Sequence, residues 1–317
     1  MLAAARELRY RPSELARALR RQQTSTVGLL VPDINSPLAT AIFHELDVLA
    51  AREGIGIVVA NSGFKPERER EWLELLASKQ MDVLLFWPCC DDREPMLRLL
   101  DTGQALVQIV CPVAGVPTPS FAVDFEATGR IGLRHLLEHG HDNIAVLSLN
   151  RRAMVRSLEG VHKQLAEGGS QCQLSVGVLE NGPRVSDATQ LALRVLGGSP
   201  RPTALLALEY NAFIGAHLAV QQLGLRVPED VAVVAVSERK WLGYLLPPIT
   251  AIMHDSHGLA VAIAALLRRR LMGERIEPEQ VTFSPRLVIR RSCGCQEKWD
   301  PLTTDGTSPL DAEPGPD

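Results

Sequence analysis

Short runs of apolar residues recur along the chain from residue 26 onward, separated by amphipathic stretches. Runs such as TVGLLV and VAVVAV are nearly continuous in apolar residues and do not alternate with polar ones. That pattern is typical of parallel strands whose two faces are both covered. We therefore predict strands over residues 26–31, 55–60, 82–87, 105–110, 143–148, 174–179, 203–208 and 231–236.

The stretches between these runs have the apolar spacing of helices, and several carry clear end signals. Pro66 stands at a helix start, with Glu67 and Glu69 in the first turn, where acidic side chains favour the helix dipole. Gly140 and Gly224 follow apolar helical patterns as C-terminal stops. The predicted helices cover residues 36–53, 66–79, 93–102, 126–139, 155–167, 186–197, 209–223 and 256–272.

Regular alternation of strands and helices predicts an α/β fold built from right-handed βαβ units. The chain has 317 residues and too many units for one small open sheet, so two doubly wound parallel-sheet lobes are favoured, with the break near residues 140–142. Ligands of such folds bind beyond the carboxyl ends of the strands, and the natural pocket lies between the lobes. A (β/α)₈ barrel has the same alternation and remains the alternative architecture.

Composition and charge narrow the function classes. No apolar run approaches the length of a membrane span, and the N-terminus lacks a signal-peptide pattern, so we expect a cytoplasmic protein that does not contact the membrane. The net charge is −4, but residues 1–21 hold six arginines and two glutamates, or +4, which leaves −8 for the remainder. A basic arm on an acidic body favours local contact with a polyanion, although a solvated helix would give the same charge.

The six cysteines are expected to be free thiols, and no metal or other cofactor is predicted. The pairs CC at 89–90 and CGC at 293–295 lack the ligand spacing of a zinc site. HLLEH at 135–139 fits the H-x-x-E-H pattern of a zinc hydrolase, but Gly140 ends that helix at once. No G-x-S-x-G, P-loop or G-x-G-x-x-G motif is present, so we predict a protein that is not an enzyme.

Several motifs, in a fixed order, resemble LacI-type transcriptional regulators. They are YRPSELARALR followed by TSTVGLLVPDINSP, then VDFEATGRIGLRHLLEHGHDNIAVL, GLRVPEDVAVVAV and the closing PRLVIRRS. The resemblance spans about residues 1–292 and implies two periplasmic-binding-protein-like lobes, an effector cleft, a homodimer and a helix-turn-helix headpiece. It assigns residues 25–140 plus 252–275 to the first lobe and residues 141–251 plus 276–292 to the second. Residues 293–317 read as a disordered tail.

The headpiece is where the chain departs from the family pattern. Residues 1–24 match only a remnant of it, the equivalent of its last helix and the hinge, so the helix-turn-helix is expected to be truncated. Two explanations stay open. In the first, a GTG valine codon was read as the start codon, and the reading frame continues upstream. In the second, the protein is a headless regulator, that is, one without the helix-turn-helix headpiece.

The resemblance also implies that the hinge segment folds when it pairs with its dimer mate on operator DNA. Leu19 matches an apolar wedge that opens a minor-groove base step, and Ala16 allows close approach of the two hinges. Arginines of the segment would contact phosphates or the minor groove. The alternative is an ordinary amphipathic linker. The hinge residues assigned to DNA are Arg11, Ser13, Ala16, Arg17, Leu19, Arg20 and Arg21.

Effector contacts are expected from the loops after the strands, as the family pattern implies. Asp124 follows a strand end, where its carboxylate would accept hydroxyl hydrogen bonds, and Arg151 would offer a fork to a carboxylate or phosphate. Groups that clamp sugar hydroxyls in relatives differ here: Ser157 replaces an expected arginine, so an ordinary hexose is disfavoured. The effector residues predicted are Asn35, Ser36, Trp87, Asp124, Arg151, Arg156, Glu209, Tyr210, Ser237 and Glu238.

The function that these features favour is a DNA-binding transcriptional regulator, a repressor, controlled by a sugar-like or other small metabolite bound between two lobes. The alternative is a headless small-molecule-binding protein without sequence-specific DNA binding.

Overall fold

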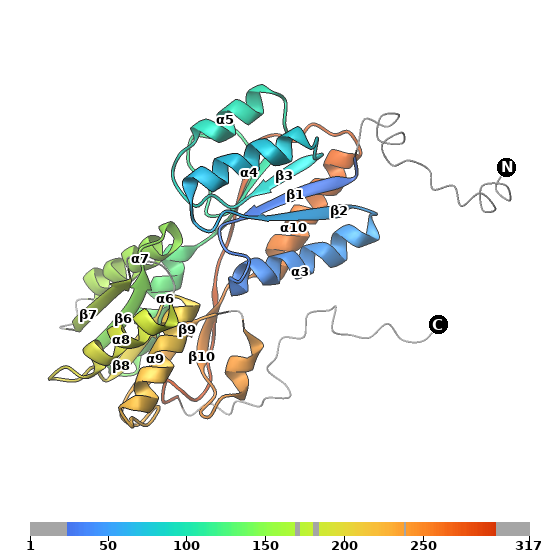
Figure 1. Ribbon diagram of the computed structural model, residues 1–317. Helices are drawn as coiled ribbons and strands as arrows, with labels where there is room; N and C mark the ends of the chain where they lie inside the picture. The colour runs from blue at the N-terminus through green and yellow to red at the C-terminus, as the bar shows by residue number, and fades with distance from the viewer. Residues whose placement is uncertain (1–23, 169–171, 180–183, 238, 296–317) are drawn as a thin grey trace, which may run out of the picture. The chain divides into compact units, whose positions relative to one another are not determined.

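The computed structural model describes residues 24–168, 172–179, 184–237 and 239–295, and the hinge residues and the predicted tail beyond residue 295 lie outside this part of the chain. The described residues form two compact units (Figure 1). The first contains residues 24–34, 43–122 and 260–281, and the second contains residues 35–42, 123–259 and 282–295. Neither unit is continuous in sequence.

The first unit is built around a six-stranded sheet of order β11-β5-β4-β3-β1-β2, in which β1 to β5 run parallel. Its central strands are buried throughout, which explains why their sequences are continuously apolar. The strands are β1 (Thr26–Val31), β2 (Gly56–Asn61), β3 (Val83–Phe86), β4 (Leu106–Val110), β5 (Ser120–Val123) and β11 (Gln280–Phe283).

Helices cover both faces of this first sheet. Helices α4 and α5 lie on one face, and α3 and α10 lie on the other (Figure 1). Leu73 and Met96, from α4 and α5, join Leu30 and Phe86 of the sheet in one buried apolar cluster. The helix bounds are α3 Pro37–Arg52, α4 Pro66–Ser78, α5 Glu94–Asp101 and α10 Ser256–Leu271.

The second unit has a six-stranded sheet of order β12-β10-β9-β8-β6-β7. Its strands are parallel except β12, which pairs antiparallel with β10 at the edge. The strands are β6 (Asn143–Leu149), β7 (Gln173–Leu179), β8 (Ala204–Ala207), β9 (Ala232–Val236), β10 (Thr250–Met253) and β12 (Arg286–Val288).

Two helix pairs sandwich the second sheet, as the separate clusters on its two faces show. Leu133 of α6 and Val161 of α7 pack with Val146 on one face, while Ala192 of α8 and Phe213 of α9 pack on the other. The helices are α6 (Phe125–Glu138), α7 (Arg152–Gly168), α8 (Val185–Leu196), α9 (Tyr210–Gln222) and the 3₁₀ segment η1 (Lys240–Tyr244).

The predicted fold class is confirmed, and the barrel alternative is excluded by two separate open sheets. Each predicted strand and helix is present within a few residues, and Pro66 begins α4 as expected. Gly140 and Gly224 follow α6 and α9 with φ of +82° and +65°, the left-handed geometry that ends helices. The predicted strands did not include β10, β11 or β12, and β5 was expected only as the strand end before Asp124.

The boundary between the units differs from the one predicted near residues 140–142. Residues 123–138, which include α6, group with the second unit. The physical reason is that Leu133 and Leu136 are fully buried against Ile144 and Val146 of β6. In the part of the chain that the structure describes, no helix is both long and apolar enough to cross a membrane.

Candidate functional site

Three predicted effector residues lie along the carboxyl edge of the second sheet. Strands β6, β8 and β9 are neighbours in this sheet and run parallel, so the loops that follow them lie side by side. Arg151, Glu209 and Ser237 occupy these loops, within two residues of each strand end. Such an edge is where open α/β sheets bind ligands.

Glu209 is held as the N-cap of α9. Its carboxylate accepts hydrogen bonds from the backbone N–H groups of Asn211 at 2.6 Å and Ala212 at 3.1 Å. The Asn211 side-chain amide donates to the second carboxylate oxygen at 3.2 Å. These bonds satisfy donors that a helix start leaves open and place a negative charge at the positive end of the helix dipole. The geometry therefore gives Glu209 a structural task that the sequence did not reveal.

Tyr210 belongs to a cluster that sequence reasoning only partly found. The Arg239 guanidinium carbon lies 5.8 Å from the centre of the Tyr210 ring, in cation–π range. The Trp241 ring meets Tyr210 edge to face, with centroids 6.4 Å apart. The Ser237 hydroxyl accepts a hydrogen bond from the Arg239 backbone N–H at 3.2 Å, which anchors the start of this loop. We name Tyr210, Arg239 and Trp241 the aromatic–arginine cluster.

Arg239 and Trp241 were missed although a signal was present. Both follow Ser237 within four residues, so the rule that loops after parallel strands supply ligand contacts would have included them. Trp241 is 37% exposed, which is unusual for so large an apolar side chain. An exposed aromatic face beside a guanidinium suits a ligand that combines a ring with an anionic group.

Predicted residues of the first sheet also follow strand ends, but their side chains differ in accessibility. Asn35 is exposed and Ser36 is half-buried, in the turn between β1 and α3. Trp87 directly follows β3 and is only 8% exposed, and its backbone N–H donates to the Leu30 carbonyl. Its indole is therefore mainly part of the core.

Asp124 joins β5 to α6 and caps that helix. Its carboxylate oxygen Oδ1 accepts from the Ala127 backbone N–H at 2.8 Å. The Thr128 hydroxyl, one turn into the helix, lies 3.0 Å from the Asp124 carbonyl and 3.2 Å from His254 Nε2. One carboxylate oxygen is thus already engaged in the helix start.

The remaining predicted residues divide into those placed elsewhere and those not described. Arg156 is exposed on α7, and the neighbouring Ser157 is fully buried, with its hydroxyl donating to the Ala153 carbonyl. Glu238 and the hinge residues from Arg11 to Arg21 lie outside the described residues. The structure therefore brings together Arg151, Glu209, Tyr210 and Ser237, and it places Arg156 away from a strand end.

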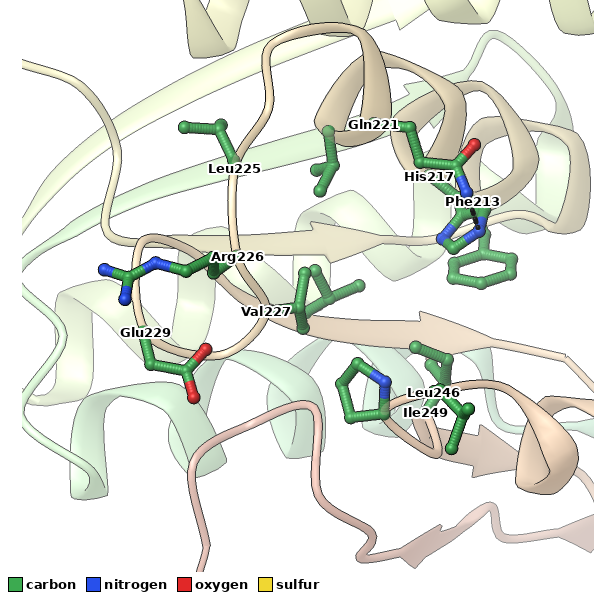
Figure 2. Close-up of a pocket in the computed structure, with 12 residues that line it drawn as sticks. Phe213, His217, Gln221, Leu225, Arg226, Val227, Glu229, Leu246 and Ile249 are labelled. Carbon is green, nitrogen blue, oxygen red and sulfur yellow. Dashed lines mark hydrogen bonds between the residues drawn. The ribbon is translucent and has the colours of Figure 1, made fainter.

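A pocket of about 370 Å³ lies in the second unit, near the amino ends of β9 and β10 (Figure 2). Phe213 and His217 of α9 line it together with Ile249 and Leu246, whose side chain is 94% exposed. None of the predicted effector residues lines this pocket. The Phe213 ring lies 6.4 Å from Trp241, so the pocket wall adjoins the aromatic–arginine cluster through one shared aromatic contact.

Comparisons with known proteins agree with this architecture. A family model described as a periplasmic binding protein-like domain matches residues 133–293. The HTH-type transcriptional repressor PurR of Histophilus somni (strain 129Pt) is 27% identical over 299 residues, covering 92% of this chain and 88% of that protein. PurR of Escherichia coli O1:K1 / APEC is 28% identical over 296 residues, covering 92% and 86%.

A solved structure shows the same fold. The Lac repressor bound to ONPG in the repressed state is similar with a TM-score of 0.78 and 22% identity, covering 92% of this chain and 88% of that one. The chain belongs to the periplasmic binding protein-like family. The family match defines this class, and the two open, mainly parallel sheets agree with it. Within it, the similarity to LacI-type regulators is confirmed, and the chain carries the effector-binding domain of that type.

Proposed function

We propose that this protein is a DNA-binding transcriptional repressor whose affinity for operator DNA is set by a small-molecule effector. Curated relatives that align over nine-tenths of the chain are repressors, which supports regulation of transcription. The effector would contact the loops at the carboxyl ends of the strands, and the hinge residues between Arg11 and Arg21 would contact DNA as part of a homodimer in the cytoplasm.

The observation that carries the effector proposal is the aromatic–arginine cluster at the carboxyl edge of the second sheet. Arg151 follows β6 and Arg239 follows β9, with β8 between the two strands, and Tyr210 and Trp241 offer aromatic faces beside Arg239. Guanidinium groups bind carboxylates and phosphates bidentately, and aromatic faces pack on sugar rings or planar rings. The effector class that fits is a small metabolite with a ring and an anionic group.

Regulation would follow from a shift between two conformations of the chain. An effector that binds one conformation more tightly raises its population, and reciprocity requires that DNA binding change by the same factor. A tenfold change in DNA affinity needs about 1.4 kcal/mol of coupling. The alternative function, a headless small-molecule-binding protein, would keep the effector site and lack specific DNA binding.

The effector test is a thermal-shift screen of sugar phosphates, sugar acids and nucleobases on the purified chain, followed by calorimetric titration of each hit. Arg239→Ala should weaken binding of a true effector at least about tenfold, because a charge-assisted contact is lost. Arg194→Ala, which changes an exposed arginine on α8 of the same unit, is the matched control. Equal affinity of Arg239→Ala and the control would place the effector elsewhere.

The DNA test compares the chain with a version extended through the upstream reading frame. A repressor gives a sequence-specific complex whose affinity falls steeply with salt and changes with the effector. Leu19→Ala should weaken that complex, because the hinge wedge is removed. If neither version forms such a complex while effector binding persists, the DNA-free alternative is correct.

A further inference from the structure

We propose that His135, His139, Cys293 and Cys295 form a tetrahedral site for one Zn²⁺ ion in the second unit. The two histidines lie at the end of α6, and the two cysteines lie far away in sequence, in the segment that follows β12. Neither HLLEH nor CGC alone has the pattern of a zinc site, but the two motifs lie side by side in the folded chain.

Potential ligand atoms of three residues, His135, Cys293 and Cys295, lie close together, and His139 Nε2 lies beside the Cys295 sulfur. The sulfur of Cys295 is 3.0 Å from the Cys293 sulfur, 3.0 Å from His139 Nε2 and 3.6 Å from His135 Nε2. The ligand atoms of His135, Cys293 and Cys295 all lie within 4.8 Å of one another. Zinc bonds of about 2.0–2.3 Å in a tetrahedron separate ligand atoms by roughly 3.3–3.8 Å. The atoms of His135, Cys293 and Cys295 are therefore close to this spacing, and the exposed His139 ring would move toward them to become the fourth ligand.

His139 offers the nitrogen that a metal ion needs. His139 Nδ1 lies 2.7 Å from the His135 backbone carbonyl, and since a carbonyl only accepts, this nitrogen carries the proton. Nε2 of His139 is left with its lone pair directed at the Cys295 sulfur. A backbone carbonyl that fixes the tautomer in this way is the usual support of a metal-binding histidine. His135 and His139 are four residues apart on one helix face, with ring centroids 4.4 Å apart.

The cysteines are held in place by the sheet. The Ser292 hydroxyl donates to the Val233 carbonyl at 2.6 Å and accepts from the Thr250 backbone N–H at 2.8 Å. The Thr250 hydroxyl points at the Cys293 sulfur at 3.0 Å. Gly294 has φ of +82°, a conformation that favours glycine and turns the chain between the two cysteines. The segment is thus positioned by contacts that do not depend on a metal.

The two thiols would bind zinc as thiolates, because the thiolate is the form that ligates metals. Binding would release the thiol protons to solvent as two sulfur–zinc bonds form.

A second cluster in the described residues makes a useful contrast. Glu69, Cys89 and Cys90 also lie within 4.8 Å of one another. There the Cys89 backbone N–H already occupies a Glu69 oxygen at 2.6 Å, and the cluster has no imidazole. Zinc binding is therefore assigned to the histidine–cysteine cluster.

Four protein ligands leave no open position for water, so the site would be structural and not hydrolytic. Zinc would fasten the segment 292–295 to the end of α6. His139 is exposed, which gives the ion a path from solvent. Thiolate and imidazole ligands select zinc over magnesium and calcium, which prefer oxygen.

The test is metal analysis and Co²⁺ titration of the full chain, after chelation and in the presence of a reductant. The expected result is one Zn²⁺ per chain, a rise in Tm on zinc addition, and visible d–d and near-ultraviolet thiolate bands on Co²⁺ addition. Tetrahedral sulfur and nitrogen ligation produces the intense visible bands, which octahedral oxygen ligation does not.

The variants replace the two more accessible ligands, Cys295 and His139. His135 and Cys293 are buried, so replacing them would also perturb packing. Cys295→Ser and His139→Ala should each weaken Co²⁺ binding by more than about 100-fold, at or above the loss known for outer-shell partners. Cys172→Ser and His162→Ala, in the same unit but outside the cluster, are matched controls and should bind as the wild type does.

Octahedral cobalt spectra, or variants that bind as tightly as the controls, would overturn the proposal. A reduced, folded chain that takes up no metal would also overturn it. If mass analysis shows a Cys293–Cys295 disulfide that persists under the same reductant and prevents metal uptake, the pair is a redox element and the zinc site is wrong.

Discussion

Gly129 of α6 faces the carbonyl oxygen of Ser157 on α7 so closely that a Cβ atom on the glycine would lie 1.8 Å from that oxygen. The reverse contact is equally tight: a Cβ on Gly160 would lie 2.0 Å from the Glu126 carbonyl oxygen. The two helices therefore touch backbone to backbone at this crossing. Lys163, which is exposed, and Glu126, which is half-buried, add an ion pair of 2.6 Å beside it.

Gly129→Ala should destabilise the second unit severely, by about 3 kcal/mol or more. The added methyl group would meet backbone atoms, so the backbones of α6 and α7 would have to move apart. Urea denaturation followed by circular dichroism measures the loss. Gly56→Ala is the control, since a Cβ there would meet its nearest atom at 3.7 Å. Comparable stability of the two variants would mean that α6 and α7 separate easily.

Replacing Asp124 separates its capping role from the proposed effector contact. Asp124→Ala should cost about 1 kcal/mol of stability because the bond to the Ala127 N–H is lost, whereas Asp124→Asn should keep most of it. An effector contact through the carboxylate predicts weaker binding in both variants. Denaturation measures the capping role, and calorimetric titration with the same effector measures the contact. Unchanged effector affinity in both variants would show that Asp124 acts only as a helix cap.

His217 makes stability depend on pH near neutrality. Burial lowers its pKa from the ordinary value of 6.5, so between the two values the unfolded chain binds more protons than the folded one. Its contribution is therefore complete above about pH 6.5 and is lost as the pH falls below that value. His217→Asn should lose less stability than the wild type between about pH 7.5 and 5.5, measured by urea midpoints. The exposed His162→Asn is the control, and parallel losses in all three proteins would contradict the assignment.

Tyr210 tests the aromatic–arginine cluster from its other side. Tyr210→Ala should weaken effector binding about tenfold, because it removes the ring beneath Arg239, while Tyr210→Phe keeps the ring and most of the affinity. Calorimetric titration with the effector found by screening gives the measurement. If Phe and Ala at this position weaken binding equally, the hydroxyl and not the ring makes the contact.

Much of the fold was predictable because burial on both faces leaves a strong mark on sequence. The run at residues 26–31 is the strand Thr26–Val31 with the same ends, and its last five residues are buried. Two of the missed strands, β11 and β12, lack that mark. Gln280–Phe283 alternates exposed and half-buried residues, and Arg286–Val288 has only three residues. They are strands because a sheet edge offers them hydrogen-bond partners, which is a tertiary effect.

The candidate site was predictable only in outline. The order of strands and helices correctly indicated that Arg151, Glu209 and Ser237 follow strand ends, and their contacts with an effector remain a prediction. It did not reveal that Glu209 turns its carboxylate onto its own helix. Nor does any periodicity link His135 to Cys293, because they come together only in the folded chain, where the segment after β12 reaches the end of α6.

Discontinuity of the two units has a consequence for synthesis. The first sheet takes its outer strand β11 from residues 280–283, and the second takes β12 from residues 286–288. Both cores thus depend on the last part of the described chain, although domains of most multidomain proteins complete in order as they leave the ribosome. Here neither sheet gains all its strands until translation has passed residue 280, so a nascent chain stalled earlier would expose both unfinished edges to chaperones.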